Sequence, residues 1–267
     1  MAKAKRSVKD SVFRDLFGKD RDAKINLLSL YNALFNAVET DPEQITNVSL
    51  DDTVFAAIVN DVAFTIGDRS VVLAEHQSTV NENMPLRMLL YIGREYERMT
   101  KQSDRYRKAL ITVPTPEFVV FYNGTDSQPA ERVMKLSDAY ATPTGSPALE
   151  LTVKQININV AVNHPLLQKC SVLREYAQMV EITRQAGRNK KDMKEAIEEC
   201  IRRGILADYL SRKAKEVINM LIGEYNYEDD LRVQRQEAAE QERQSVFERM
   251  ITLGYTEEEA KKVAFNE

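Results

Sequence analysis

Histidine and cysteine are scarce in this sequence, with only two residues of each type among 267. Neither pair has the spacing of a metal finger, and two cysteines cannot build a disulfide framework. A structural zinc site and a histidine-rich nuclease site are therefore disfavoured. Cys170 and Cys200 fall on helical runs, so we expect them to be small, buried apolar residues.

Long apolar runs are also missing. No segment approaches the ~18 apolar residues of a membrane span, and the first 13 residues contain no apolar region typical of a signal peptide. We therefore expect a cytoplasmic protein that does not cross a membrane. The net charge of −4 excludes a uniformly basic surface. Binding to a nucleic acid would therefore require a local basic face.

What the chain does contain is enough apolar material for a core, since 43% of its residues are hydrophobic and 29% are charged. Periodicity predicts, in order, helices within 7–37, a hairpin over 60–77, a helix over 84–102 and strands over 109–113, 117–124 and 149–160. Residues 125–148 hold proline and glycine and are predicted to be loop. From residue 166 onward helical periodicity dominates. This order predicts an α/β core over residues 1–165 and a helical region over residues 166–267.

The hairpin reads "DVAFTIGDRSVVLAEHQ" and carries an acid near each outer end. If the turn centres on Asp68, Asp61 and Glu75 lie directly opposite each other, with Cβ atoms about 4.5–5.5 Å apart. Strand alternation places Gln77 on the same face. Two carboxylates at that separation repel, so something must compensate for their charge.

A divalent cation is the simplest compensation, because hard oxygen ligands suit Mg²⁺ or Mn²⁺. The backbone carbonyl of His76 is a further candidate ligand, which gives a metal set of Asp61, Glu75 and His76. Such a metal can polarise a phosphate and activate a water molecule. The alternative is that Asp61 is a solvent-exposed residue at the end of a strand and that Glu75 lies on a solvent-exposed face of the sheet.

The helix after the hairpin carries a basic stripe, in which Arg87, Tyr91, Arg94 and Arg98 repeat at helical spacing. A basic stripe beside paired carboxylates suits a polyanion such as DNA. The packing side of the helix is expected to consist of apolar or small residues, namely Leu86, Leu89, Leu90, Gly93 and Tyr96. The alternative is a solvated face on which Arg94 and Arg98 pair with Glu95 and Glu97.

Several segments resemble one family when they are taken in order. "DSVFRDLFG", "ND" before a strand and "LAEHQSTVNENMPLRMLLYIGREYE" resemble the PD-(D/E)XK nuclease family transposases and the recombination-promoting nucleases. Those proteins carry an Asp, then Glu-x-Gln in place of the usual Glu-x-Lys, then a helix with a recurrent Arg and Tyr. The matching positions here are Asp61, Glu75, Gln77, Arg87 and Tyr91. Later segments also resemble this family, so that the resemblance spans roughly residues 8–225.

The resemblance implies a restriction-endonuclease-like PD-(D/E)XK core, a mixed β-sheet flanked by helices, followed by an α-helical C-terminal region. It implies Mg²⁺-dependent cleavage of DNA, with Asp61 and Glu75 as metal ligands and Gln77 where the wider superfamily has a lysine. Glutamine cannot carry a positive charge, so Arg87 is a candidate for supplying it. In this superfamily the first helix sometimes adds an acid, here Asp10 or Asp15, although surface pairing with nearby lysine and arginine is the favoured role for both.

Three functions remain open from the sequence. The first is a metal-dependent DNA endonuclease. The second is a catalytically weak or inactive nuclease fold that binds DNA or a protein partner. The third is a structural α/β protein whose acids face solvent. A homodimer fits the first function, because double-strand cutting by a nuclease with one site usually requires two copies.

Overall fold

The computed structural model describes residues 11–48, 62–74, 81–101, 103, 106–142, 144–187 and 189–265. The chain divides into two compact units, Met1–Leu221 and Ile222–Glu267. The division after residue 165 that the sequence suggests stays a prediction.

The described elements alternate between strands and helices in the first half of the chain and are helical in the second half. The strands are β1 (Thr46–Val48), β2 (Val62–Ile66), β3 (Arg69–Ala74), β4 (Thr115–Tyr122), β5 (Glu131–Lys135) and β6 (Thr152–Asn157). The helices are α1 (Val12–Arg14), α2 (Ala23–Phe35), α3 (Met84–Met99), α4 (Pro165–Lys169), α5 (Ser171–Gln185), α6 (Lys190–Arg202), α7 (Ala207–Thr252) and α8 (Glu257–Phe265).

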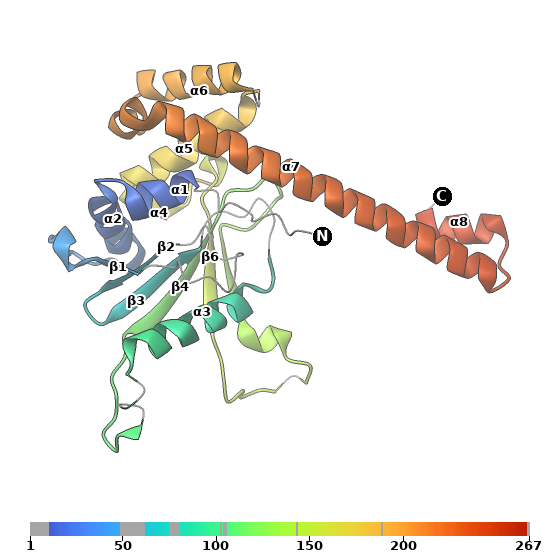
Figure 1. The fold of residues 1–267 in the computed structure, drawn as a ribbon, viewed down its shortest axis with the longest axis horizontal. Helices are drawn as coiled ribbons and strands as arrows, with labels where there is room; N and C mark the ends of the chain where they lie inside the picture. Colours follow the sequence, from blue (N-terminus) through green and yellow to red (C-terminus); the bar gives the residue numbers. More distant parts are fainter. Residues whose placement is uncertain are drawn as a thin grey trace. The chain divides into compact units, whose positions relative to one another are not determined.

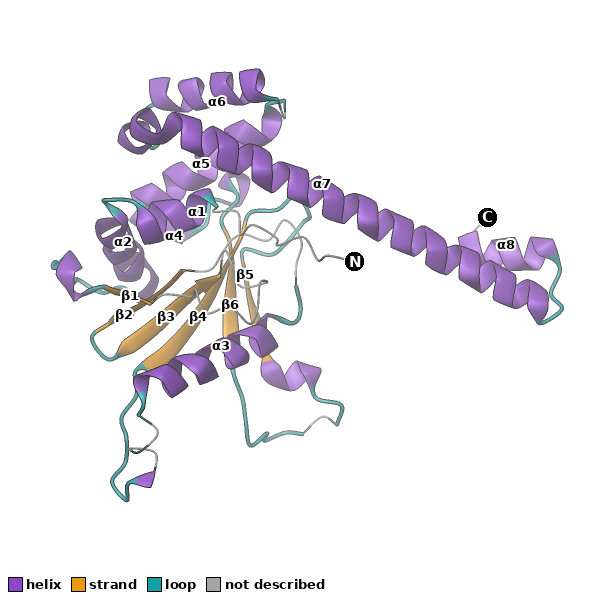
Figure 2. Cartoon of the chain, viewed as in Figure 1, coloured by secondary structure: helices purple, strands orange, loops and turns teal. Residues whose placement is uncertain are grey.

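The described strands form one mixed sheet in the order β1-β2-β3-β4-β6-β5. Strand β4 is parallel to both β3 and β6, whereas the remaining neighbours are antiparallel. Helices α1, α2, α4 and α5 cover one face of the sheet and α3 covers the other (Figure 1). The expectation of an α/β fold with a mixed sheet flanked by helices is therefore confirmed, as the strands and helices in Figure 2 show.

The β2–β3 hairpin has a two-residue turn, Gly67 and Asp68, and Gly67 adopts the positive φ of 53° that glycine tolerates. The register pairs Ile66 with Arg69 and Val62 with Leu73. The turn therefore centres between Gly67 and Asp68, and the expectation that it centres on Asp68 was wrong. A shift of one residue moves a side chain to the opposite face of a strand.

Two further expectations about strands were wrong. Residues 109–113, predicted to be a strand, are irregular, and Leu110 is 95% exposed. Strand β5 lies inside the stretch of residues 125–148 that was predicted to be loop. It pairs antiparallel with β6 at the edge of the sheet, where the partner strand fixes a conformation that the local sequence does not specify.

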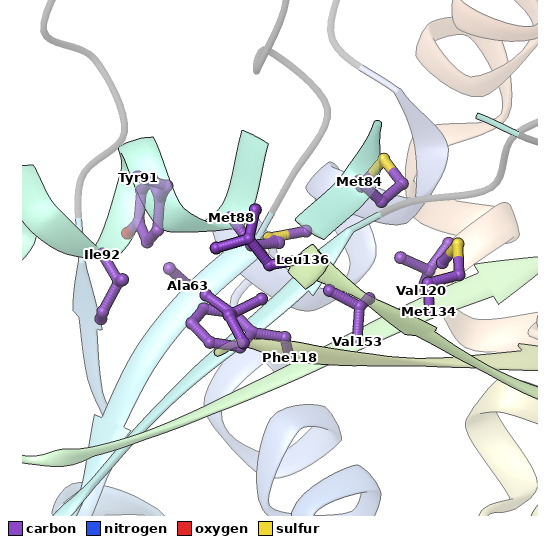
Figure 3. Packing of buried hydrophobic residues seen from close by; sticks show 11 residues of the cluster. Ala63, Met84, Met88, Tyr91, Ile92, Phe118, Val120, Met134, Leu136 and Val153 are labelled. Carbon is purple, nitrogen blue, oxygen red and sulfur yellow. The ribbon is translucent and has the colours of Figure 1, made fainter. Parts of the chain in front are cut away.

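The core between α3 and the sheet is built from methionine, branched aliphatic and aromatic side chains (Figure 3). Met84 and Met88 from α3 pack in one cluster with Phe118 and Val120 of β4 and with Val153 of β6. On the other face of the sheet, Phe13 of α1 contacts Phe121, with ring centroids 5.8 Å apart. The sheet is thus sandwiched between two apolar layers.

Both cysteines are buried, as predicted, and both are free thiols. Burial raises the pKa of Cys170, and it raises the pKa of Cys200 to about 11. Neither thiol is therefore suited to act as a nucleophile. Among the described helices, none combines the length and the hydropathy that a membrane crossing requires.

The second unit contains the part of α7 from residue 222 onward and the short helix α8. A capping box lies at the start of α8, because Thr256 Oγ1 accepts from the Glu259 N–H at 3.3 Å and Glu259 Oε2 accepts from the Thr256 N–H at 2.9 Å. Ala260 is fully buried, and the rings of Phe247 and Phe265 lie 6.0 Å apart. The two helical segments therefore pack against each other.

Candidate nuclease site

The predicted catalytic residues flank the described hairpin. Asp61 precedes Val62, the first residue of β2, and Glu75 follows Ala74, the last residue of β3. Asp61, Glu75, His76 and Gln77 themselves lie outside the described residues. The corrected register removes the geometric reason for placing Asp61 directly opposite Glu75.

The edge of the sheet at which β3 ends is nevertheless described. Strands β3, β4 and β6 run parallel, with Ala74 beside Val120 and Val120 beside Gln155. Parallel strands end at the same edge, so the carboxyl ends of these three strands lie together. We call this the carboxyl edge of the sheet.

The four residues predicted as a DNA-binding stripe on α3 do not share an exposed face. Arg94 and Arg98 are exposed, but Arg87 is half-buried, and its Nη1 lies 3.2 Å from the sulfur of Met84. Tyr91 is only 8% exposed and belongs to the apolar cluster shown in Figure 3. The exposed part of the predicted stripe is therefore limited to its two later arginines.

The predicted packing side of α3 was wrong in part. Leu89 and Tyr96 do pack against the cluster, but Leu86 and Leu90 are 43% and 45% exposed, and Gly93 is exposed too. The buried face instead follows a helical period that begins two residues earlier, at Met84, and continues through Met88, Tyr91, Ile92 and Glu95. Pro85 occupies the first turn, where its missing N–H costs least.

One of the ion pairs proposed for a solvated face, Arg98 with Glu95, is present, but its carboxylate is buried. Arg98 Nη2 lies 2.5 Å from Glu95 Oε2, and the Glu95 side chain is 5% exposed. Burial raises the pKa of Glu95, and the nearby guanidinium of Arg98 opposes that rise. Arg98 therefore stabilises a buried carboxylate, which reduces its value as a contact for DNA.

A second group of acids lies between the N-terminal helices and the start of α7. Asp15, in the π-helical turn Asp15–Lys19, accepts hydrogen bonds from Tyr209 Oη and Lys213 Nζ, each at 2.8 Å. Both oxygens of Asp20 bind Arg212, at 3.0 Å each. Asp15 therefore pairs with a cation, but the expected surface pair with a nearby lysine or arginine was wrong, because the pair is buried and Lys213 is 198 positions away. No sequence pattern marked Asp20. Asp10 lies outside the described residues.

The charge of Asp20 is stabilised by this network. Burial alone would raise the pKa of Asp20, but the hydrogen bonds from Arg212, from the Asp22 N–H and from Lys213 outweigh burial and lower the pKa to about 2. Asp20 is thus a carboxylate at neutral pH whose charge is already matched by cations of this chain. Such a group is suited to hold the fold together and not to bind a metal.

No group of three or more histidine, cysteine, aspartate or glutamate side chains suited to a metal ion occurs within the described ranges. Asp61 and Glu75, which the sequence suggests as ligands, are outside those ranges. Their chemistry, two carboxylates beside backbone and amide oxygens, does fit a hard divalent cation.

A comparison with protein families adds to this geometry. The family model described as PD-(D/E)XK nuclease family transposase matches residues 7–144, more than half of the chain. The chain belongs to this family. The resemblance found in the sequence is therefore confirmed over residues 7–144, whereas the resemblance of the later segments, up to about residue 225, stays a prediction. The family suggests a nuclease-type function. No curated protein and no solved structure matched the chain.

The match to the PD-(D/E)XK nuclease family transposases extends from the first helix to the loop after β5 and the short helical turn Leu136–Ala139. It therefore contains the whole β2–β3 hairpin and α3, where the candidate catalytic residues lie. Strand β6 and the helices from α4 onward fall outside the match. Their residues must be interpreted from the structure alone.

Proposed function

We propose that this chain is a metal-dependent endonuclease that hydrolyses phosphodiester bonds of DNA. The observation that carries the proposal is the family match over the segment that contains Asp61 and Glu75. The described hairpin supports it, because β2 begins immediately after Asp61 and β3 ends immediately before Glu75.

In this proposal Asp61 and Glu75 hold Mg²⁺ or Mn²⁺, and the carbonyl of His76 is a further ligand. A divalent ion bound there would polarise a phosphate oxygen and lower the pKa of a bound water molecule. Gln77 orients a water molecule or a phosphate through its amide, since it cannot act as a cation. Arg87 remains the proposed source of positive charge on α3.

DNA is the proposed substrate, and the exposed Arg94 is the contact on α3 that the structure supports best. Arg98 is exposed too, but it also neutralises Glu95. Tyr91 is proposed to support the helix from the core, because its burial leaves little surface for DNA. Cutting of both strands would require two copies of the site, which a homodimer supplies.

The test is cleavage of supercoiled plasmid in Mg²⁺ or Mn²⁺ by the wild type and by an Asp61→Asn/Glu75→Gln variant. A control variant, Glu39→Gln/Glu258→Gln, removes the same number of charges from two exposed positions. We expect nicking or linearisation by the wild type and by the control, and at least ~100-fold less by the site variant, in line with the loss of a charge-stabilising group.

Equal cleavage by the wild type and the site variant would show that the nuclease activity does not depend on these two acids. No cleavage by any of the three proteins, together with binding to the plasmid, would favour a nuclease fold that only binds DNA. A linear product formed without a nicked intermediate would support the homodimer.

A further inference from the structure

The carboxyl edge of the sheet contains several buried amide side chains. Asn123 directly follows Tyr122, the last residue of β4, and Asn157 is the last residue of β6. Asn123 is 1% exposed and Asn157 is 2% exposed. A buried amide costs free energy unless its N–H groups find acceptors, so the partners of these side chains are informative.

Two of the amides at this edge have their donors satisfied by the protein. Asn157 Nδ2 donates to the Gln128 carbonyl at 3.0 Å. Asn159 Nδ2 donates to the Gly124 carbonyl at 3.0 Å and to Asn157 Oδ1 at 2.9 Å. These bonds fix the chain that leaves β4, so the two asparagines have a structural role.

Asn123 differs from them. Its side-chain nitrogen is buried and has no hydrogen-bond acceptor anywhere in the described part of the chain. Its oxygen lies 3.5 Å from Nη2 of Arg184, which is in the last turn of α5. The same guanidinium also donates to the backbone carbonyl of Asn123. An N–H group of Asn123 and the guanidinium of Arg184 are thus held next to each other.

Arg184 differs from Arg212, whose hydrogen bonds go to carboxylates. The hydrogen bonds of Arg184 go only to neutral oxygens of Asn123, and within the described ranges it has no carboxylate partner. A guanidinium has five N–H donors in a planar fork, so donors remain for a ligand. The residue is half-buried, so part of the guanidinium side chain is open to solvent.

We infer that Arg184 binds a backbone phosphate of the DNA at the carboxyl edge of the sheet and that Asn123 positions its guanidinium. This inference rests on the proposed function, because Glu75 follows the strand β3 that ends at the same edge. A phosphate accepts from two N–H groups of a guanidinium at once, and the oxygens of Asn123 hold that guanidinium without neutralising its charge. Arg184 also supplies a fixed positive charge, which Gln77 cannot.

The test uses the full chain and a short fluorescein-labelled DNA duplex, with binding measured by anisotropy in EDTA over a range of salt concentrations. Arg184→Ala should weaken binding about tenfold and reduce the salt slope by about one. Arg174→Ala, which removes an exposed arginine from the same helix, is the matched control and should stay within about twofold of the wild type.

A second variant separates a ligand-binding role from a structural one. Asn123→Asp keeps an acceptor for Arg184 but gives that guanidinium a carboxylate partner, so the thermal midpoint should be retained. Its affinity for the duplex should fall as far as that of Arg184→Ala, because the added negative charge repels phosphate. Arg184→Lys should retain part of the affinity, because it keeps the charge but not the fork.

Wild-type affinity and salt slope in Arg184→Ala and Asn123→Asp would overturn the inference, even if the plasmid is cleaved. Loss of stability in Asn123→Asp with unchanged affinity would also overturn it and would leave a structural role. If the wild type neither binds the duplex nor cleaves plasmid, both this inference and the proposed function fail. If the wild type binds without cleaving, and Arg184→Ala and Asn123→Asp weaken that binding, the phosphate site is supported and the proposed cleavage is not.

Discussion

Cationic side chains have different partners in two regions of the first compact unit. At the start of α7, Arg212 and Lys213 bind the carboxylates of Asp20 and Asp15, whose side chains are 1% and 8% exposed. At the carboxyl edge of the sheet, Arg184 binds only the neutral oxygens of Asn123 among the described residues. In the first region each cation is paired with a carboxylate, whereas in the second region Arg184 is not paired with a carboxylate among the described residues.

This difference separates a structural role from a binding role. A cation that neutralises a buried carboxylate cannot leave it without a large cost, because the remaining charge would be buried alone. A cation that is hydrogen-bonded only to neutral oxygens keeps its net charge and can therefore bind an anionic ligand. The three predictions below test this contrast, beginning with the largest expected effect.

The first prediction concerns the buried network. Arg212→Met removes two hydrogen bonds, each 3.0 Å long, from the buried Asp20 and leaves Lys213 at 3.3 Å as its remaining cation. We expect the free energy of unfolding to fall by about 2–4 kcal/mol. The measurement is denaturant unfolding followed by far-ultraviolet circular dichroism, because the chain has no tryptophan.

A matched control for this variant is Arg202→Met, which removes an exposed arginine that pairs with Glu199 on the surface of α6. Surface pairs contribute little, so the change should be below about 1 kcal/mol. Equal losses of unfolding free energy in the two variants would show that the pairing of the buried Asp20 contributes no more stability than a surface pair.

The second prediction concerns pH. The pKa of Asp20 is lowered from 3.8 to about 2 in the folded state, so its contribution to stability is complete above pH 3.8. That contribution is lost as the pH falls from about 4 to about 2, where the folded chain must take up a proton. The variant Asp20→Asn should be less stable at neutral pH and should show a smaller loss over this range.

Unfolding curves measured at several pH values between about 2 and 5 test this expectation. Since other acids also titrate there, the informative quantity is the difference between the wild type and Asp20→Asn. A difference that does not change with pH would contradict the assignment of the lowered pKa to Asp20.

The third prediction has the smallest effect and concerns α3. Arg94→Ala should weaken binding to duplex DNA about threefold and lower the salt slope by up to about one, without a change in stability. Arg98→Ala, in contrast, should also destabilise the protein, because the buried Glu95 loses its cation. A Lys190→Ala variant on α6 is a control for the loss of one exposed charge.

Salt-dependent anisotropy and thermal unfolding of the same three proteins decide between these outcomes. If Arg94→Ala binds as tightly as Lys190→Ala, the outer face of α3 does not contact DNA, and Arg184 would then be the better-supported contact.

The parts of the fold that depend on local signals could be predicted from the sequence. Pro85 in the first turn of α3 and the box formed by Thr256 and Glu259 act within one helical turn, so the residues carry the information themselves. The hairpin was located correctly, but its register was not. A two-residue and a three-residue turn differ by one position, and "GDR" allows either.

Burial on α3 was harder to predict because two different faces of the helix contain apolar residues. Leucine is a more hydrophobic residue than tyrosine, yet Tyr91 is buried whereas Leu86 and Leu90 are exposed. The run from Met84 through Met88 to Ile92 has the correct helical period and was the signal that identifies the buried face.

The residues of the candidate site that the sequence missed come from distant segments. Arg184 and Asn123 are 61 positions apart, and neither belongs to a motif. Their proximity follows from how α5 packs against the sheet, which no local pattern specifies. Sequence reasoning therefore points to the residues that a family motif marks, whose roles stay predictions, and does not point to residues that tertiary packing brings together.

The order in which the chain is synthesised gives the network at the start of α7 a further consequence. Lys213 and Asp15 are 198 positions apart, and Arg212 and Asp20 are 192 apart. On the ribosome, the N-terminal helices and all six strands of the described sheet are made before either cation exists. The buried ion pairs of the first unit therefore form only after the first turns of α7 have been made. A nascent chain that stops before Arg212 contains Asp15 and Asp20 but lacks the two cations that pair with them.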